Sequence, residues 1–217
     1  MRKMTCFLPC RKGSVRVPHK NTKPFAEYNN GLIEVKLKQL ANVKEIDEIV
    51  LTTNDVEILE YAEGLGVEKI TLHHRKEELS SSLTSTDELV KHASSLIPQG
   101  DILWTHVTSP FITERHYKNI IQDYKKAIKN GYDSLMTVTE LYSFLWKNGV
   151  PINYDRNVEK WPRTQTIEPI YEVNSGAFIA ASELYTEYND RIGKSPYLYV
   201  LDKLTSHDID WEMIFYW

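Results

Sequence analysis

Cationic side chains cluster after the first hydrophobic run of the chain, in the segment LPCRKGSVRVPHKN at residues 8–21. Within this segment, Gly13 and Ser14 allow the backbone to turn tightly and to direct N–H groups toward an anion. Such a basic turn is typical of a phosphate site, because phosphoryl transfer depends chiefly on positioning and on charge stabilisation. The basic and imidazole side chains of the region are Arg11, Lys12, Arg16, His19, Lys20 and Lys23.

The spacing of this basic loop excludes two common phosphate-binding motifs. It matches neither the G-x-x-x-x-G-K-[ST] loop nor the G-x-G-x-x-G fingerprint, so an ATPase of that type or an NAD enzyme fits poorly. A basic run can also be a solvated loop that only aids solubility. Its place directly after a predicted strand favours the phosphate site, because ligands bind at the carboxyl ends of parallel strands.

Two carboxylates near the end of the chain, Asp208 and Asp210, are separated by one residue. In an extended segment their side chains face the same way and can share one hard cation. Mg²⁺ is the candidate, because it takes only one or two protein carboxylates and fills its other positions with water and phosphate oxygens. The alternative is that Asp210 caps a C-terminal helix over residues 211–217.

The elements that must position these groups are read from hydrophobic periodicity and from capping residues. Short strand-like runs alternate with longer helical runs, which predicts parallel βαβ units in a three-layer α/β/α fold with a mostly parallel, Rossmann-like sheet. Strands are expected at residues 4–8, 48–52, 69–72, 101–105, 134–138, 171–180 and 197–201. Helices are expected at residues 32–41, at 55–65 with Asp55 as cap, at 87–96, at 113–130 with Thr113 as cap, and after Ser182 as the cap of a short helix.

Residues 140–169 break the alternation, since this stretch contains Trp146, Gly149, Pro151, Trp161, Pro162 and Pro169. This stretch is expected to be an irregular or hairpin insert, and it could serve either as a dimer arm or as a substrate lid. A chain of 217 residues is otherwise long enough for one substantial α/β domain.

The bulk composition narrows the class of protein. A net charge of −4 argues against general nucleic-acid binding, and few aromatic residues interleave with the basic loop. The basic N-terminus has only a short apolar run, and no stretch approaches the length of a membrane span. Cys6 and Cys10 would lie roughly 13 Å apart along a strand, too far for a disulfide. We therefore expect reduced thiols in a cytoplasmic protein that binds no nucleic acid and no membrane.

The basic loop resembles the signature of the acylneuraminate cytidylyltransferases, the CMP-sialic acid synthetases and their bacterial relatives. The residues that match in register are Arg11, Pro18, Lys20 and Asn21, whereas Cys10, Val15 and Arg16 depart from the family pattern. The resemblance implies that Arg11 and Lys20 are catalytic and hold a triphosphate, with Lys20 offsetting charge at the α-phosphate. It also implies nucleotide binding by Gly13, Ser14 and Asn21.

Two further segments are similar to motifs of the same family. Arg75 and Leu79 match a segment whose Arg lies near the nucleotide and whose loop helps to select cytosine; Ser82 stands where the family has Asp. After the predicted strand at 101–105, Thr108 and Ser109 match a T-S-P loop, which otherwise would only begin a turn. His106 stands where Gln is common, at a position the family uses against the sugar acid.

Later segments resemble the family's acceptor motifs. Arg163 and Gln165 match P-R-x-Q, which would let Arg163 meet a sugar carboxylate through a bidentate pair. Asn174 matches the N-G-A motif, but Ser175 is inserted before the glycine and Ile179 replaces the usual Tyr. These changes predict an altered acceptor pocket.

The resemblance implies that residues 1–217 form a single nucleotidyltransferase domain of the nucleotide-diphospho-sugar transferase type. The implied reaction transfers CMP from CTP to a 2-keto sugar acid of the sialic-acid type, with Mg²⁺ held by Asp208 and Asp210, in a homodimer formed through the insert. A 3-deoxy-manno-octulosonate transferase and a catalytically silent nucleotide-binding relative are alternatives. Other nonulosonic acids, such as legionaminate or pseudaminate, remain open as acceptors.

Overall fold

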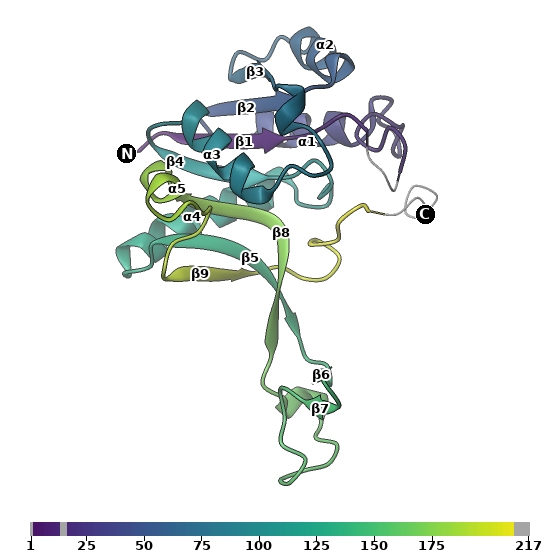
Figure 1. The fold of residues 1–217 in the computed structure, drawn as a ribbon, viewed down its shortest axis with the longest axis vertical. Coiled ribbons are helices and arrows are strands. Elements are labelled where there is room, and N and C mark those ends of the chain that lie inside the picture. The colour runs from purple at the N-terminus through teal and green to yellow at the C-terminus, as the bar shows by residue number, and fades with distance from the viewer. Residues whose placement is uncertain (1, 14–16, 211–217) are drawn as a thin grey trace.

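The computed structural model describes residues 2–13 and 17–210, which form a seven-stranded sheet covered by helices and a long arm that projects from it (Figure 1). The strands are β1 (Met4–Pro9), β2 (Glu48–Thr53), β3 (Ile70–His74), β4 (Asp101–Thr105), β5 (Ser134–Leu141), β6 (Trp146–Lys147), β7 (Val150–Pro151), β8 (Ile170–Ala181) and β9 (Pro196–Val200). The helices are α1 (Gly31–Ala41), α2 (Val56–Gly64), α3 (Thr86–Leu96), α4 (Glu114–Lys129) and α5 (Ser182–Tyr188), with 3₁₀ turns η1 (Glu77–Leu79) and η2 (Thr164–Thr166).

The order of strands in the sheet is β3-β2-β1-β4-β8-β5-β9. Strands β1 to β4 pair in parallel with one another, and β5 pairs in parallel with β9. Strand β8 is antiparallel to both β4 and β5. The predicted, mostly parallel sheet is therefore confirmed, with one reversed strand. The reversal follows from the connection, because β5 and β8 are joined through the arm without a crossover helix.

The helices cover both faces of the sheet, which confirms the expected three layers. One core cluster joins the sheet to buried side chains of α1, α2 and α4, among them Leu37, Ile58 and Ile120. A second cluster on the other face contains Val90 of α3 and Tyr185 of α5. Sheet strands between two such layers are buried on both sides, which explains why every residue of β1 and β4 is buried.

Capping residues define most helix starts as the sequence predicts. The carboxylate of Asp55 accepts a hydrogen bond from the Glu57 N–H at the start of α2, and Thr113 is the N-cap of α4. Ser182 is the first residue of α5 and Ala181 its N-cap, so the prediction of Ser182 as the cap was wrong by one position. The predicted helix at 211–217 lies outside the described residues.

The predicted insert at residues 140–169 is the arm (Figure 1). Strands β5 and β8 run beyond the rest of the sheet as a two-stranded ladder, and the small β6–β7 sheet lies at the far end. The Arg156 guanidinium carbon lies 5.4 Å from the ring centroids of both Trp146 and Trp161, which braces this end by cation–π contacts.

The sequence also predicts reduced cysteines and no membrane span. Cys6 and Cys10 are both buried free thiols, as the strand geometry predicts. Throughout residues 2–13 and 17–210, every helix is too short or too polar to cross a lipid bilayer.

Candidate active site

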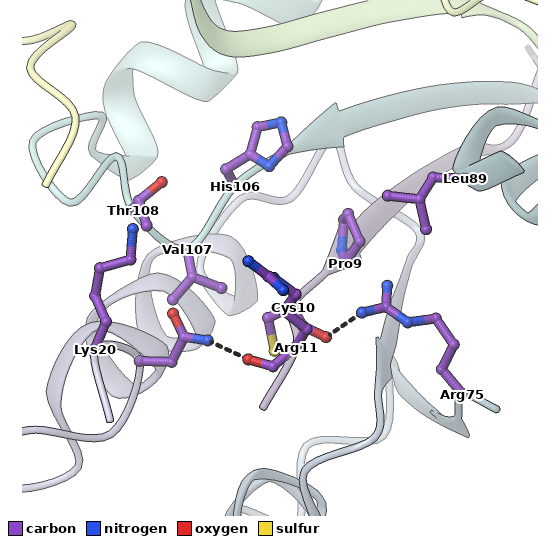
Figure 2. A pocket seen from close by; sticks show the side chains of 10 residues that line it. Pro9, Cys10, Arg11, Lys20, Arg75, Leu89, His106, Val107 and Thr108 are labelled. Atoms are coloured by element: carbon purple, nitrogen blue, oxygen red, sulfur yellow. Dashed lines mark hydrogen bonds between the residues drawn. The ribbon is translucent and has the colours of Figure 1, made fainter. Parts of the chain in front are cut away.

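A cavity of about 260 Å³ opens where β1 and β4 end side by side (Figure 2). The parallel register that pairs Phe7 with Trp104 brings the basic loop after β1 next to the loop after β4. The cavity is lined by Pro9, Cys10, Arg11, Lys20, Asn21, Arg75, Leu89, His106, Val107 and Thr108. The structure thus brings together six of the predicted nucleotide- and sugar-binding residues, namely Arg11, Lys20, Asn21, Arg75, His106 and Thr108.

Hydrogen bonds between the loop backbone and two asparagine side chains fix the basic loop at the rim of this cavity. The Lys12 N–H donates to Asn54 Oδ1 at 2.9 Å, and the Asn21 side chain donates to the Arg11 carbonyl at 3.1 Å. Gly13 has a φ of +76°, in the left-handed region that favours glycine, as the predicted tight turn requires. A further cavity of about 210 Å³ is also lined by Arg11, Gly13, Lys20 and Asn21. Ser14 and Arg16 lie outside the described residues.

Arg75 is held rigidly on the opposite wall of the cavity, and only 3% of its surface is exposed. Its Nη2 donates to the Cys10 carbonyl at 2.7 Å (Figure 2). Its Nε donates to Ser80 Oγ at 3.1 Å. Its Nη1 is buried and has no hydrogen-bond acceptor in the part of the chain that the structure describes. Burial, with Arg11 nearby, lowers the pKa of Arg75, although a guanidinium remains charged. A buried cationic donor beside a cavity is suited to an anionic or carbonyl oxygen.

The acidic segment (residues 208–210) reaches the same edge of the sheet. Asp210 Oδ1 lies 2.9 Å from Lys20 Nζ, and the Ile209 N–H donates to the Thr108 carbonyl at 2.8 Å. Asp208 lines a neighbouring cavity of about 530 Å³, which also contacts Asn174. The acidic segment therefore lies between the cavity of the basic loop and this second cavity.

The carboxylates of Asp208 and Asp210 suit Mg²⁺ better than a metal that needs a protein cage. Within the described ranges, no three His, Cys, Asp or Glu side chains come together as a metal site. Mg²⁺ keeps several waters and is usually bound by one or two carboxylates plus substrate phosphates, which is what this pair beside a cationic cavity can provide.

A β-bulge (residues 174–177) shapes the second cavity. The β5–β8 register jumps from Met136 opposite Phe178 to Val138 opposite Val173, which leaves the bulge to face Thr137 alone. Asn174 Oδ1 accepts hydrogen bonds from Thr137 Oγ1 at 2.7 Å and from the Gly176 N–H at 3.2 Å. The inserted residue that the sequence singled out, Ser175, adopts a φ of +56° in this bulge. The altered acceptor motif is thus a local change in backbone path.

Comparison with known proteins identifies the family. A family model described as cytidylyltransferase matches residues 5–211. The chain belongs to this family. The match includes both the basic loop and the acidic segment, so these two features occur together in a nucleotidyltransferase enzyme that uses CTP.

Individual relatives extend this result. The cytidylyltransferase is 27% identical over 220 residues to the pseudaminic acid cytidylyltransferase of Campylobacter jejuni, across 96% of this chain and 91% of that one. It is 26% identical over 225 residues to the N-acylneuraminate cytidylyltransferase of Escherichia coli, across 98% of this chain and 50% of that one.

Solved structures confirm the fold of this cytidylyltransferase. CMP:2-keto-3-deoxy-manno-octonic acid synthetase complexed with CTP has a TM-score of 0.67 at 13% identity, over 97% of this chain and 94% of that one. A 4-diphosphocytidyl-2C-methyl-D-erythritol synthase has a TM-score of 0.66 at 10% identity, over 100% of this chain and 97% of that one. The expected nucleotide-diphospho-sugar transferase architecture is therefore confirmed.

Two side chains in the first cavity of the cytidylyltransferase are uncharged. Burial, together with the cationic Arg191, Lys36 and Lys20, lowers the pKa of His106 to about 3, so the imidazole is neutral near pH 7. A neutral ring offers one donor and one acceptor to a ligand. Burial raises the pKa of the Cys10 thiol to about 11, which excludes a thiolate nucleophile near neutral pH.

Several of the predicted site residues do not line either the 260 Å³ or the 530 Å³ cavity of their own chain. Ser82 is exposed on the loop between η1 and α3, and Arg163 and Gln165 are exposed on the arm. Ser109 is buried, and its carbonyl accepts a hydrogen bond from Lys36. Lys36 itself was not predicted, although a lysine among the apolar positions of a helix is a recognisable signal.

Proposed function

We propose that this cytidylyltransferase transfers CMP from CTP to a nonulosonic acid of the sialic or pseudaminic type and releases pyrophosphate. The observation that carries the proposal is the 2.9 Å contact between Lys20 Nζ and Asp210 Oδ1. It joins the phosphate-binding loop to the acidic segment, beside a second cavity of about 530 Å³ with room for an acceptor. The names of the Campylobacter jejuni and Escherichia coli relatives support this class of acceptor.

In the proposed reaction, the anomeric hydroxyl of the sugar acid attacks the α-phosphorus of CTP in line and pyrophosphate leaves. Arg11 and Lys20 hold the phosphates, and the Lys20 ammonium offsets the charge that builds on the α-phosphate oxygens. Arg75 contacts the nucleotide through its Nη1, which its other hydrogen bonds leave available. No covalent enzyme intermediate is needed.

Asp208 and Asp210 would hold the Mg²⁺ ion. When bound, the ion neutralises phosphate charge and lowers the pKa of a coordinated hydroxyl. Chelation with EDTA should therefore stop pyrophosphate release, and added Mg²⁺ should restore it.

The acceptor is expected between the two cavities, against Asn174 and Thr108, with the neutral His106 able to hydrogen-bond a sugar hydroxyl. Ser109 takes part through its backbone, because its carbonyl holds the loop after β4 by accepting a hydrogen bond from Lys36. For Arg163 and Gln165 to meet the same acid, the arm of one subunit must reach the site of a second subunit. The proposal therefore includes a homodimer formed through residues 140–169.

The experiment is a pyrophosphate-release screen of CTP, ATP, GTP and UTP against N-acetylneuraminic, pseudaminic, legionaminic and 3-deoxy-manno-octulosonic acids. We expect release only with CTP and with at least one nine-carbon acid. If pyrophosphate is released only with 3-deoxy-manno-octulosonic acid, the acceptor is that eight-carbon acid and not a nonulosonic acid. CTP binding without release in any combination would instead favour a silent relative.

A further inference from the structure

Lys36 is a lysine with no exposed surface, on the apolar face of α1 between Ile33 and Leu40. Its Nζ donates to the Ser109 carbonyl at 2.7 Å, to the Tyr117 hydroxyl at 2.7 Å and to the Ile112 carbonyl at 3.5 Å. These oxygens account for the three donors of an ammonium group. A buried charge is costly unless it is hydrogen-bonded in this way, so the position demands a donor and not merely an apolar side chain of similar length.

One branch from Lys36 leads to the acidic segment. Ser109, whose carbonyl Lys36 holds, follows Thr108, and the Thr108 carbonyl accepts the Ile209 N–H at 2.8 Å. Ile209 lies between the two candidate magnesium ligands. Burial lowers the pKa of Lys36 to about 7. The ammonium group thus lies directly behind the loop that supports the acidic segment.

A second branch leads to the bulge at residues 174–177. The Tyr117 hydroxyl lies 2.7 Å from Thr105 Oγ1, which in turn donates to the Gly176 carbonyl at 2.7 Å. Asn174, in the same bulge, donates to Thr139 Oγ1 at 3.1 Å, and Thr139 contacts a residue of the C-terminal segment, Ser206, at 3.0 Å between hydroxyl oxygens. The second branch thus lines the second cavity through Asn174, Thr139 and Ser206, and both branches end in the C-terminal segment that carries Asp208.

We propose that Lys36 is a positioning residue that fixes the acidic segment and the bulge relative to each other, and so aligns the acceptor side of the site with the triphosphate. The assignment of these two parts to metal and acceptor rests on the proposed function. Lys36 acts through the Ser109 carbonyl and the Tyr117 hydroxyl and touches no substrate. Misplacement of reacting groups by about 1 Å can cost on the order of 100-fold in rate, which is the scale of effect expected from its loss.

The test compares Lys36→Met with Lys38→Met, its matched control on the same helix. Lys38 is half-exposed; its Nζ pairs with Glu34 on its own helix at 2.6 Å and lies 5.3 Å from the Tyr28 ring centroid. Amide hydrogen exchange is followed by mass spectrometry at three places: the acidic segment, the bulge and β2 as a core reference. Steady-state kcat and KM for CTP are measured in parallel.

In Lys36→Met we expect faster exchange in the acidic segment and in the bulge, unchanged exchange in β2, and kcat lower by about 100-fold with little change in KM for CTP. Lys38→Met should match wild type in every measurement. Unchanged exchange in both segments would overturn the proposal, as would an equal rise in β2, because that pattern reports global destabilisation only.

If Lys36→Met does not fold, Tyr117→Phe decides the question, since it removes one Lys36 acceptor and the link to Thr105 but keeps the ring. Faster exchange confined to the bulge would support the proposal, and unchanged exchange there would overturn it. The exchange measurement needs no acceptor, so it still reports on Lys36 if wild type releases no pyrophosphate with any acid. The exchange experiment therefore tests the positioning role of Lys36 separately from the proposed CMP transfer.

Discussion

Lys20 Nζ and Asp210 Oδ1 lie 2.9 Å apart although 190 residues separate them in the chain. The contact joins the loop after the first strand to the segment after the last one, at the carboxyl edge of the sheet. An ammonium group beside a carboxylate can exchange that partner for a phosphate oxygen when a triphosphate binds, while the carboxylate turns to a cation. This pair is therefore the centre of the site in our account.

Replacing Arg75 by Lys should weaken CTP binding even though the charge is kept. A lysine cannot bond the Cys10 carbonyl and Ser80 together and still offer a donor to the cavity. We expect KM for CTP to rise by at least about tenfold, since one charge-assisted hydrogen bond is worth roughly 1.5 to 3 kcal/mol and about 1.4 kcal/mol corresponds to a factor of ten. Initial rates at varied CTP give the answer; an unchanged KM would remove Arg75 from the nucleotide site.

Local rules made much of the fold predictable from the sequence. Asp55 and Thr113 begin their helices where the capping pattern indicates, and the helix–strand alternation yields the layers and the edge that carries the site. The basic loop was predictable because its charges are adjacent in sequence and follow a strand. Such signals depend only on residues that are close together in the sequence, so they can be read without a structure.

Long-range relations were less predictable. The reversal of β8 depends on how the arm returns to the sheet, and the contacts of Lys36 join α1 to residues 73 and 81 positions away. The place of Arg163 on the arm, outside its own chain's cavities, likewise depends on the three-dimensional path of the insert. Family resemblance supplied expected roles, but it could not supply this geometry.

The backbone at Ser175 gives a test of the bulge. Its φ of +56° strains any side chain, and a β-branched one most of all. Ser175→Val should lower the free energy of unfolding by about 2 kcal/mol, whereas Ser175→Gly should leave it within about 1 kcal/mol of wild type. Urea titrations of the three proteins compare these values. Equal stability of the Val variant would show that the bulge adopts another conformation in solution.

Stability should fall in mild acid because of a buried histidine. Thr52 Oγ1 lies 3.0 Å from His92 Nε2 and 3.1 Å from His73 Nδ1, and burial lowers the pKa of His92 to about 4. Between pH 6.5 and pH 4 the unfolded chain binds a proton at His92 that the folded protein does not, so folding weakens as pH falls.

From pH 7 to pH 5 this single group should cost about 2 kcal/mol. Urea unfolding at both pH values measures this loss of unfolding free energy in wild type and in His92→Gln. Both proteins keep His106, so its own contribution to the pH dependence is the same in each. The difference between pH values should be smaller in the variant by that amount. A variant with the same pH dependence as wild type would show that His92 is protonated in the folded state.

The arm offers a test of the proposed homodimer. Val158 has 86% of its surface exposed near the end of the arm, where a second subunit would cover it. Val158→Asp should shift sedimentation velocity from dimer toward monomer, because burying an unpaired carboxylate is unfavourable. Leu83→Asp, at a site 91% exposed on the body of the protein, is the matched control and should remain dimeric. A monomeric wild type would contradict the homodimer.

The most direct test of the central claim is the rate of pyrophosphate release from CTP in Lys20→Ala and Asp208→Ala, with the best acceptor from the screen. Lys44→Ala, at the opposite end of the sheet near Met4, is the control. We predict a fall of at least about 100-fold in both site variants, with unchanged circular dichroism and a wild-type rate in the control. Near-wild-type release by both site variants would contradict the account.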